Sequence, residues 1–317
     1  MHPVLKEPHP AQIGSPPAPP VSRTPRTTGR AWVHVLLAVA TFATLTLAGA
    51  TYWLPLDDVW DRLTGSERVG HALSAGLIYA VWVFTILGAH EMGHYLACRY
   101  YRVPATLPYF LPFVPPIGSL GAVIRIRGAI PNRTALFDIA AAGPIAGFLV
   151  TVPVTVTGVL QARPFVFPSD GDGGMTVELG EPVLLWLMQR IATAPGELAV
   201  NPWIGAGWVG LLVTSLNLFP VGQLDGGHAA YAISRRTHRT LAWTTIVAMV
   251  GVLLVQVTVY GQFPFYVVWF AILLWMRDRH PRLVDESTPL GLGRKLVALL
   301  LVLIFALSFI LVPIHVG

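Results

Sequence analysis

The stretch that decides the fold of this chain is Leu87-Gly88-Ala89-His90-Glu91-Met92-Gly93-His94-Tyr95, at the end of an apolar segment that begins about residue 72. Two histidines four residues apart on a helix point in the same direction, one turn above the other, so both can bind one metal ion. Glu91 is rotated off that face and can hold a water molecule beside the metal. The pattern H-E-x-x-H therefore predicts two zinc ligands, His90 and His94, and a general base, Glu91.

The location of this motif argues against a chance match. A charged side chain at the centre of a bilayer costs about 2.5–3.5 kcal/mol on insertion scales. Histidine and glutamate inside an apolar segment therefore usually persist because they bind or react. We predict one Zn²⁺ ion per chain at this position.

The composition predicts a polytopic membrane protein. Hydrophobic residues make up 54% of the 317, charged residues 12%, and the mean hydropathy is +0.62. Soluble domains carry about twice that share of charge, so little room is left for a soluble domain. The net charge of +5 requires no nucleic-acid partner, because the basic residues lie between apolar segments, where orientation signals belong. The one cysteine, Cys98, excludes an internal disulfide, and we interpret it as a small helix residue and not as a ligand.

We expect an all-α fold with about seven transmembrane helices. Residues 1–30 are proline-rich without an apolar run, which predicts a disordered tail and not a signal peptide; a transit peptide stays open. Residues 31–317 are expected to form one membrane-embedded domain, with a catalytic core at about residues 70–236. The predicted spans are residues 32–54, 71–95, 134–160, 203–220, 241–260, 263–276 and 296–312.

Between the second and third spans lies an apolar segment, residues 105–130, that prolines prevent from being helical. Backbone of this kind at membrane depth must be covered by protein or line a wet cavity. We therefore expect a re-entrant loop or short β-hairpin, with a strand at about residues 121–127. An interfacial loop is the alternative.

The third span carries Ala142-Gly143-Pro144-Ile145-Ala146-Gly147. Glycines four residues apart allow another helix to approach closely. Helix packing alone would explain this pattern.

The charges predict the orientation of the chain. Basic clusters come before the first span and after the second, fourth and sixth, while the other loops are acidic or neutral. The positive-inside rule then places the N-terminus in the cytoplasm. It places the H-E-x-x-H motif and the end of the fourth span at the same, cytoplasmic side of the membrane.

A third ligand is needed, since catalytic zinc usually has three protein ligands and one open position. The end of the fourth span provides Asp225, in a glycine-bounded bend within the segment 215–228. A helix N-cap is the other interpretation of Asp225. Asp138 is a competing acid, but it lies near the start of its helix, where the helix dipole would stabilise a negative charge without any metal.

Three motifs are informative together: His90-Glu91-Met92-Gly93-His94; residues 142–147; and Asn217, Pro220 and Leu224-Asp225-Gly226-Gly227. In this combination the chain resembles the site-2 protease family of intramembrane zinc metalloproteases. The resemblance covers about residues 70–313. It is strongest to the branch without a PDZ domain, which includes chloroplast and bacterial members; residues 280–290 also look like that branch. It implies that His90, His94 and Asp225 bind zinc and that Glu91 is the base. It further implies that Asn217 contacts the substrate or oxyanion, and that a re-entrant strand pairs with substrate.

The expected function is therefore hydrolysis of peptide bonds in or near transmembrane segments of membrane-protein substrates, in the bacterial cytoplasmic membrane. The loop 161–202 is too short for a PDZ domain, which leaves the mode of substrate selection open. Two alternatives come from other classes. One is a transporter that uses the same residues as an ion path, although no repeated half supports it. The other is a catalytically idle scaffold, against which the intact Glu91 argues.

Overall fold

The computed structural model describes residues 31–54, 63–162, 164–165, 177–192, 197–261, 265–277 and 283–316. The predicted tail, residues 1–30, lies outside these ranges. So do His280 and Pro281, and most of the loop after the third predicted span, residues 161–181, which is acidic and is therefore expected on the side opposite the cytoplasm.

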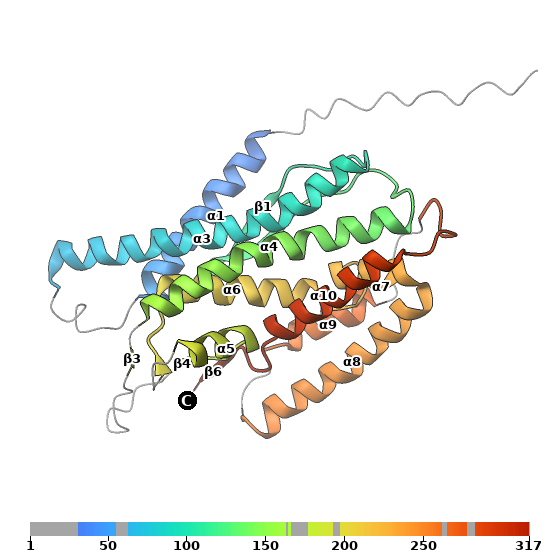
Figure 1. Cartoon of the computed structure of the whole chain (residues 1–317). Coiled ribbons are helices and arrows are strands. Elements are labelled where there is room, and N and C mark those ends of the chain that lie inside the picture. The colour runs from blue at the N-terminus through green and yellow to red at the C-terminus, as the bar shows by residue number, and fades with distance from the viewer. Residues whose placement is uncertain are drawn as a thin grey trace, which may run out of the picture. The chain divides into compact units, whose positions relative to one another are not determined.

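The described chain is mostly helical, with three small antiparallel two-stranded sheets (Figure 1). Its helices are α1 (Ala31–Tyr52), α3 (Gly65–Tyr100), α4 (Arg133–Gln161), α5 (Val183–Ile191), α6 (Pro202–Asn217), α7 (Asp225–Ile233), α8 (Arg235–Thr258), α9 (Val267–Met276) and α10 (Leu292–Ser308). Its strands are β1 (Tyr109–Pro112), β2 (Ser119–Val123), β3 (Pro164–Phe165), β4 (Val177–Leu179), β5 (Glu197–Leu198) and β6 (Ile314–Val316). The sheets pair β1 with β2, β3 with β5, and β4 with β6.

The starts of three helices follow from side chains that accept hydrogen bonds from the first free N–H groups. Asn132 accepts from the N–H of Ala135 at 2.9 Å and so begins α4. Asn201 accepts from two N–H groups at the start of α6, both at 3.0 Å. Ser234 accepts from the N–H of Thr237 at 2.9 Å and separates α7 from α8.

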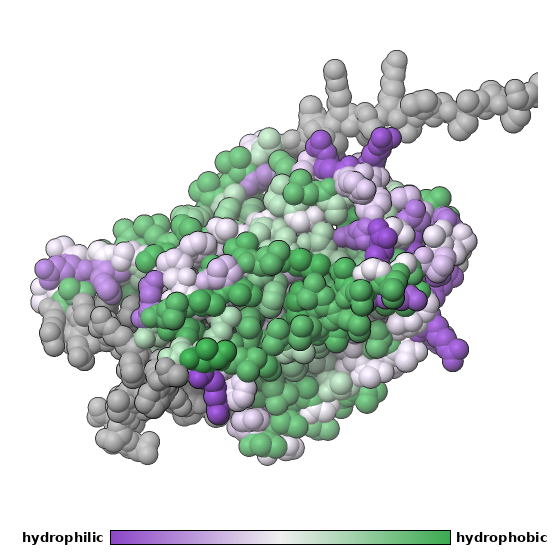
Figure 2. Space-filling model, in the orientation of Figure 1, coloured by the Kyte–Doolittle hydropathy of each residue, from purple (hydrophilic) through white to green (hydrophobic). Residues whose placement is uncertain are grey.

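Four of the described helices, α1, α3, α4 and α8, are long and apolar enough to cross a membrane. The other predicted spans correspond to α6, α9 and α10, which contain 16, 10 and 17 residues. A straight helix needs roughly 20 residues to cross the hydrocarbon core. The structure therefore supports four of the seven predicted spans. Figure 2 shows hydrophobic residues over the middle of the visible face and hydrophilic residues gathered towards the ends.

The predicted hairpin is present as β1 and β2, in which Phe110 pairs with Ala122. The strand prediction was displaced, because β2 covers Ser119–Val123 and not residues 121–127. The hairpin lies against apolar parts of α1 and α3. Phe110 stacks on Phe84 of α3 with 4.0 Å between ring centroids, and Tyr79 of α3 donates to the carbonyl of Ile117 at 2.8 Å.

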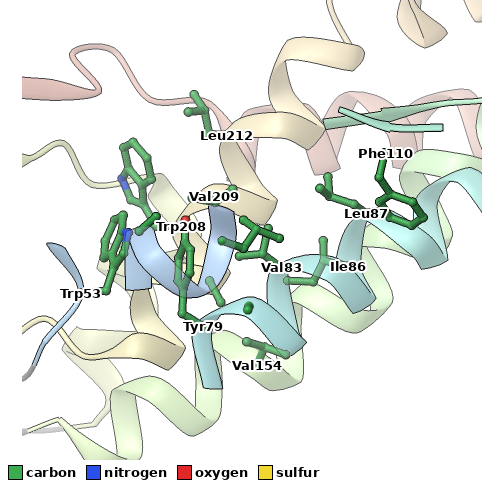
Figure 3. Close-up of a cluster of buried hydrophobic side chains, with 14 of the residues drawn as sticks. Trp53, Tyr79, Val83, Ile86, Leu87, Phe110, Val154, Trp208, Val209 and Leu212 are labelled. Carbon is green, nitrogen blue, oxygen red and sulfur yellow. The ribbon is translucent and has the colours of Figure 1, made fainter. Parts of the chain in front are cut away.

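The largest apolar core joins α3, α6 and the hairpin (Figure 3). Tyr79 and Trp208 are almost fully buried, and Trp53, which follows α1, lies 5.5 Å from the first ring and 6.0 Å from the second. Further along α3, Ile86 and Leu87 extend this core to the turn before His90. The helix that carries the motif is therefore held by packing along its length.

Candidate metal centre

The side chains predicted to bind metal come from two segments that are far apart in sequence. His90 and His94 lie on α3, and Asp225 is the first residue of α7. The Nε2 atoms of the histidines are 3.1 Å apart, and Asp225 Oδ2 lies 3.2 Å from the first and 3.3 Å from the second. All three ligand atoms thus face one point.

This spacing fits a zinc ion. Tetrahedral zinc with bonds of about 2.0–2.2 Å places its ligand atoms about 3.3–3.5 Å from one another. The donor atoms therefore need to move outward by only a few tenths of an ångström. Two imidazoles and a carboxylate are also a donor set that zinc prefers.

The site is buried. The exposed fractions of His90, Glu91 and His94 are 3%, 6% and 7%, and the Asp225 side chain is 14% exposed. Ligand atoms of His90, Glu91 and His94 also lie within 4.8 Å of one another and could by themselves hold a metal ion. We favour Asp225 as the third ligand because its oxygen lies within 3.3 Å of both histidine nitrogens.

Glu91 is held by the hairpin and not by the histidines. Its Oε2 accepts a hydrogen bond of 2.8 Å from the backbone N–H of Ile124, the residue after β2. The carboxylate is therefore fixed beside the proposed ligands, where a general base is needed. The sequence pattern did not reveal this donor, because any non-proline residue provides a backbone N–H.

His94 is oriented by a backbone carbonyl. Its Nδ1 donates to the oxygen of Ile139 on α4 at 2.7 Å, since a carbonyl can only accept. This fixes the tautomer whose Nε2 lone pair faces Asp225 and His90. A hydrogen bond of this kind to the second ring nitrogen commonly orients metal-binding histidines. Ile139 was also missed in the sequence, for the same reason as Ile124.

The small residues of α4 make room for the two imidazoles. A Cβ atom on Gly143 would lie 2.1 Å from His94 Nε2, and one on Gly147 would lie 3.2 Å from His90 Nδ1. On the opposite helix, a Cβ on Gly93 would lie 2.4 Å from the carbonyl oxygen of Ala142. The prediction that another helix approaches these glycines closely is confirmed. The space that the glycines leave is filled by the side chains of the two histidines.

The bend between α6 and α7 brings Asp225 to the site. Gly222 has a φ of +57°, a conformation that favours glycine. A Cβ on Gly226 would lie 2.0 Å from the carbonyl oxygen of Leu218, so the chain must fold back closely here. The N-cap of α7 is Leu224 and not Asp225, so a capping role for Asp225 is wrong.

Asn217 ends α6 and lies beside the first histidine. Its Nδ2 is 3.3 Å from His90 Nε2. The amide therefore faces the point on which the proposed ligands converge, and it can reach a group bound there.

Asp138, the competing acid, has other partners. Arg294 binds it with two hydrogen bonds of 2.8 and 2.7 Å, and the hydroxyl of Tyr101 donates to it as well. It is the sixth residue of α4, and the effect of a helix dipole fades within the first turn. The prediction that the helix dipole stabilises the charge of Asp138 is therefore wrong. An ion pair with Arg294 of α10 stabilises it instead.

Comparisons with known proteins agree with the motifs. The model of peptidase family M50 matches residues 78–258, more than half of the chain. The chain is 30% identical over 225 residues to "Probable zinc metalloprotease EGY2, chloroplastic" of Arabidopsis thaliana, which covers 68% of this chain and 38% of that protein. It is 31% identical over 240 residues to "Probable zinc metalloprotease EGY1, chloroplastic" of the same plant, covering 73% and 42%.

Among solved structures, "Site-2 Protease from Methanocaldococcus jannaschii" aligns with a TM-score of 0.38 at 14% identity, over 79% of this chain and 92% of that chain. The chain spans about two fifths of the length of the curated plant relatives that it matches. The matched region contains the H-E-x-x-H motif of α3, the glycine pair of α4 and the Leu224-Asp225-Gly226-Gly227 bend. On this match the chain belongs to peptidase family M50, the site-2 protease family that its motifs resemble.

Proposed function

We propose that this chain is an intramembrane zinc metalloprotease that cleaves transmembrane segments of membrane proteins. One observation carries the proposal. The Nε2 atoms of His90 and His94 and Oδ2 of Asp225 lie within 3.3 Å of one another, and Glu91 is held beside them. The zinc metalloproteases named among its relatives support the same chemistry.

The zinc ion, when bound, supplies Lewis acidity that activates water at neutral pH. Glu91 accepts the proton from water as the water oxygen attacks the carbonyl carbon of the scissile peptide. It then delivers this proton to the nitrogen of the leaving amine. The amide of Asn217 donates a hydrogen bond to the carbonyl oxygen as negative charge develops there.

A transmembrane helix is a difficult substrate, because its peptide groups are already hydrogen-bonded. It must unwind locally before a carbonyl becomes accessible, so helix-breaking residues near the cleavage site should favour cleavage. The hairpin is suited to receive the unwound segment, because Ile124, whose N–H binds Glu91, follows β2 directly. An extended segment along this hairpin would bring its peptide groups close to the base.

We also propose seven spans with a cytoplasmic N-terminus, in the bacterial cytoplasmic membrane. Ion pairs between basic and acidic residues of the predicted cytoplasmic segments support a shared side for these segments. Arg235 at the start of α8 binds Glu286, and Arg294 near the start of α10 binds Asp138 near the start of α4. Three segments predicted to be cytoplasmic, those after the second, fourth and sixth spans, are thus linked at one end of the helices, which agrees with the charge pattern.

The test is cleavage of a model transmembrane peptide by purified protein, wild type against Glu91→Gln, with zinc content measured in both. The variant should keep its zinc and lose activity by about 10²–10⁴-fold, because an amide cannot accept the proton. Near-normal cleavage by the variant would refute this mechanism. A transporter or an idle scaffold would show no cleavage even by the wild type.

A further inference from the structure

One charged group, in the turn of α4 that carries Ile139, has no part in the chemistry proposed above. Asp138 of α4 joins three elements. Arg294 of α10 binds both of its oxygens, with Nε–Oδ1 at 2.8 Å and Nη2–Oδ2 at 2.7 Å. Tyr101, which follows α3 directly, donates its hydroxyl proton to Oδ2. The side chains of Asp138 and Arg294 are 29% and 37% exposed, so this ion pair is partly shielded from water.

The residue next to Asp138 holds the metal centre. The carbonyl of Ile139 accepts the Nδ1 proton of His94 at 2.7 Å. Because the two residues share a peptide bond, holding the side chain of Asp138 also holds the turn that carries this carbonyl. Tyr101 lies two turns beyond His94, so the same carboxylate ties the end of the motif helix to α4.

This turn of α4 needs such support. Pro144 lies inside the helix and has no N–H, so the carbonyl of Ala140 lacks its usual helix partner. The proline ring also crowds that carbonyl and favours a kink. The helix is therefore weakened one residue from the carbonyl of Ile139, and Gly143 in the same turn has no side chain to stiffen it.

We propose that Asp138 and Arg294 are positioning residues for the metal centre, and that their ion pair fixes the α4 turn whose Ile139 carbonyl orients His94. This inference rests on the proposed role of His94 as a ligand. A membrane protein rarely keeps a carboxylate in an apolar helix without such a function. The two parallel hydrogen bonds of the guanidinium set direction as well as attraction, which lysine cannot reproduce.

The test measures zinc affinity of the full-length protein in detergent micelles, by competition with a chromophoric chelator. Asp138→Asn, which keeps the size of the side chain, should weaken zinc binding about tenfold, at the low end of the 10–100-fold typical for groups that orient ligands. Arg294→Lys should weaken it less, because one hydrogen bond can remain. The visible spectrum of the Co²⁺-substituted protein should also change in Asp138→Asn, since it reports the ligand field.

The chain offers a matched control in Glu286, which accepts hydrogen bonds from a tyrosine, Tyr231, and from an arginine, Arg235. Glu286→Gln weakens the same kinds of contact, but its partners, Tyr231 near the end of α7 and Arg235 at the start of α8, do not include the residue before Ile139. It should lower the melting temperature while leaving zinc affinity and the Co²⁺ spectrum as in wild type. The double variant Asp138→Asn/Arg294→Gln should lose no more zinc affinity than Asp138→Asn or Arg294→Gln alone, whichever of the two loses more. This is expected because the pair acts as a unit.

The positioning role is overturned if Asp138→Asn binds zinc within twofold of wild type with an unchanged Co²⁺ spectrum, whatever its melting temperature. His94→Ala separates this failure from failure of the ligand assignment. If His94→Ala loses zinc and Asp138→Asn does not, only the positioning role is wrong. If His94→Ala keeps its zinc, the proposed metal centre itself is wrong.

Discussion

Gly143→Ala should disable the metal centre by adding a single methyl group. The new Cβ would lie 2.1 Å from His94 Nε2, about 1.3 Å short of the 3.4 Å at which ordinary contacts begin. The imidazole cannot yield easily, because Ile139 holds its other nitrogen at 2.7 Å. Either His94 or the whole of α4 must therefore move by about 1 Å. A misplacement of that size costs about 10²-fold in rate, and overpacking costs about 1–3 kcal/mol in stability.

The assay is zinc per chain and peptide cleavage for Gly143→Ala, compared with alanine at two other helical glycines. Gly147→Ala brings its Cβ only to 3.2 Å from atoms of His90, so a shift of a few tenths of an ångström should suffice and activity should fall slightly. Gly251→Ala in α8 meets nothing within 4 Å and should behave as wild type. Full zinc content and activity in Gly143→Ala would refute the geometry of His94. Equal losses in all three variants would point to a general effect of alanine instead.

Three further predictions address the third ligand, the orientation of the chain and the ion pair of Glu286. Asp225→Ala should lose most of its bound zinc after purification without chelator, and retention of zinc would refute that ligand. Cysteines placed at Arg99 and Arg235 in a Cys98-free background should both be labelled from the cytoplasm; labelling from opposite sides would break the proposed site. Hydrogen bonds from Arg235 and Tyr231 lower the pKa of Glu286 to about 2 from its usual 4.5. The ionised carboxylate therefore stabilises the fold above pH 4.5 and this contribution is lost as the pH falls towards 2. The melting temperature of Glu286→Gln should fall less steeply than that of wild type in this window, and equal slopes would contradict the prediction.

The sequence predicted those parts of the site that depend on local spacing. The H-E-x-x-H spacing predicted that His90 and His94 face the same way, and the predicted topology put Asp225 at the same depth; the three side chains do lie together. The close approach of another helix to α4 was predicted from Gly143 and Gly147, because glycine has no Cβ to interfere, but the sequence did not show that this helix is α3.

The parts that depend on long-range contacts could not be predicted. Asp138 and Arg294 are 156 residues apart, and no local pattern links them. The hydrogen bonds of Ile124 and Ile139 use backbone atoms, which leave no trace in residue type. The predicted position of β2 was wrong by a few residues. An apolar, proline-rich segment lacks the alternation of polar and apolar residues that sets strand register. The lengths of α6, α9 and α10 are set by packing and bends, which hydropathy alone does not measure.

The separation of the proposed ligands along the chain has a consequence for biosynthesis. Asp225 lies 135 residues after His90, so the proposed third ligand is synthesised long after both histidines. A nascent or truncated chain that ends before α7 holds both histidines and Glu91 but has no carboxylate from the bend to complete the zinc site. For the protease proposed above, activity can therefore begin only once α7 lies against α4 with Asp225 beside the histidines of α3, so a shorter chain could not yet cut neighbouring membrane proteins.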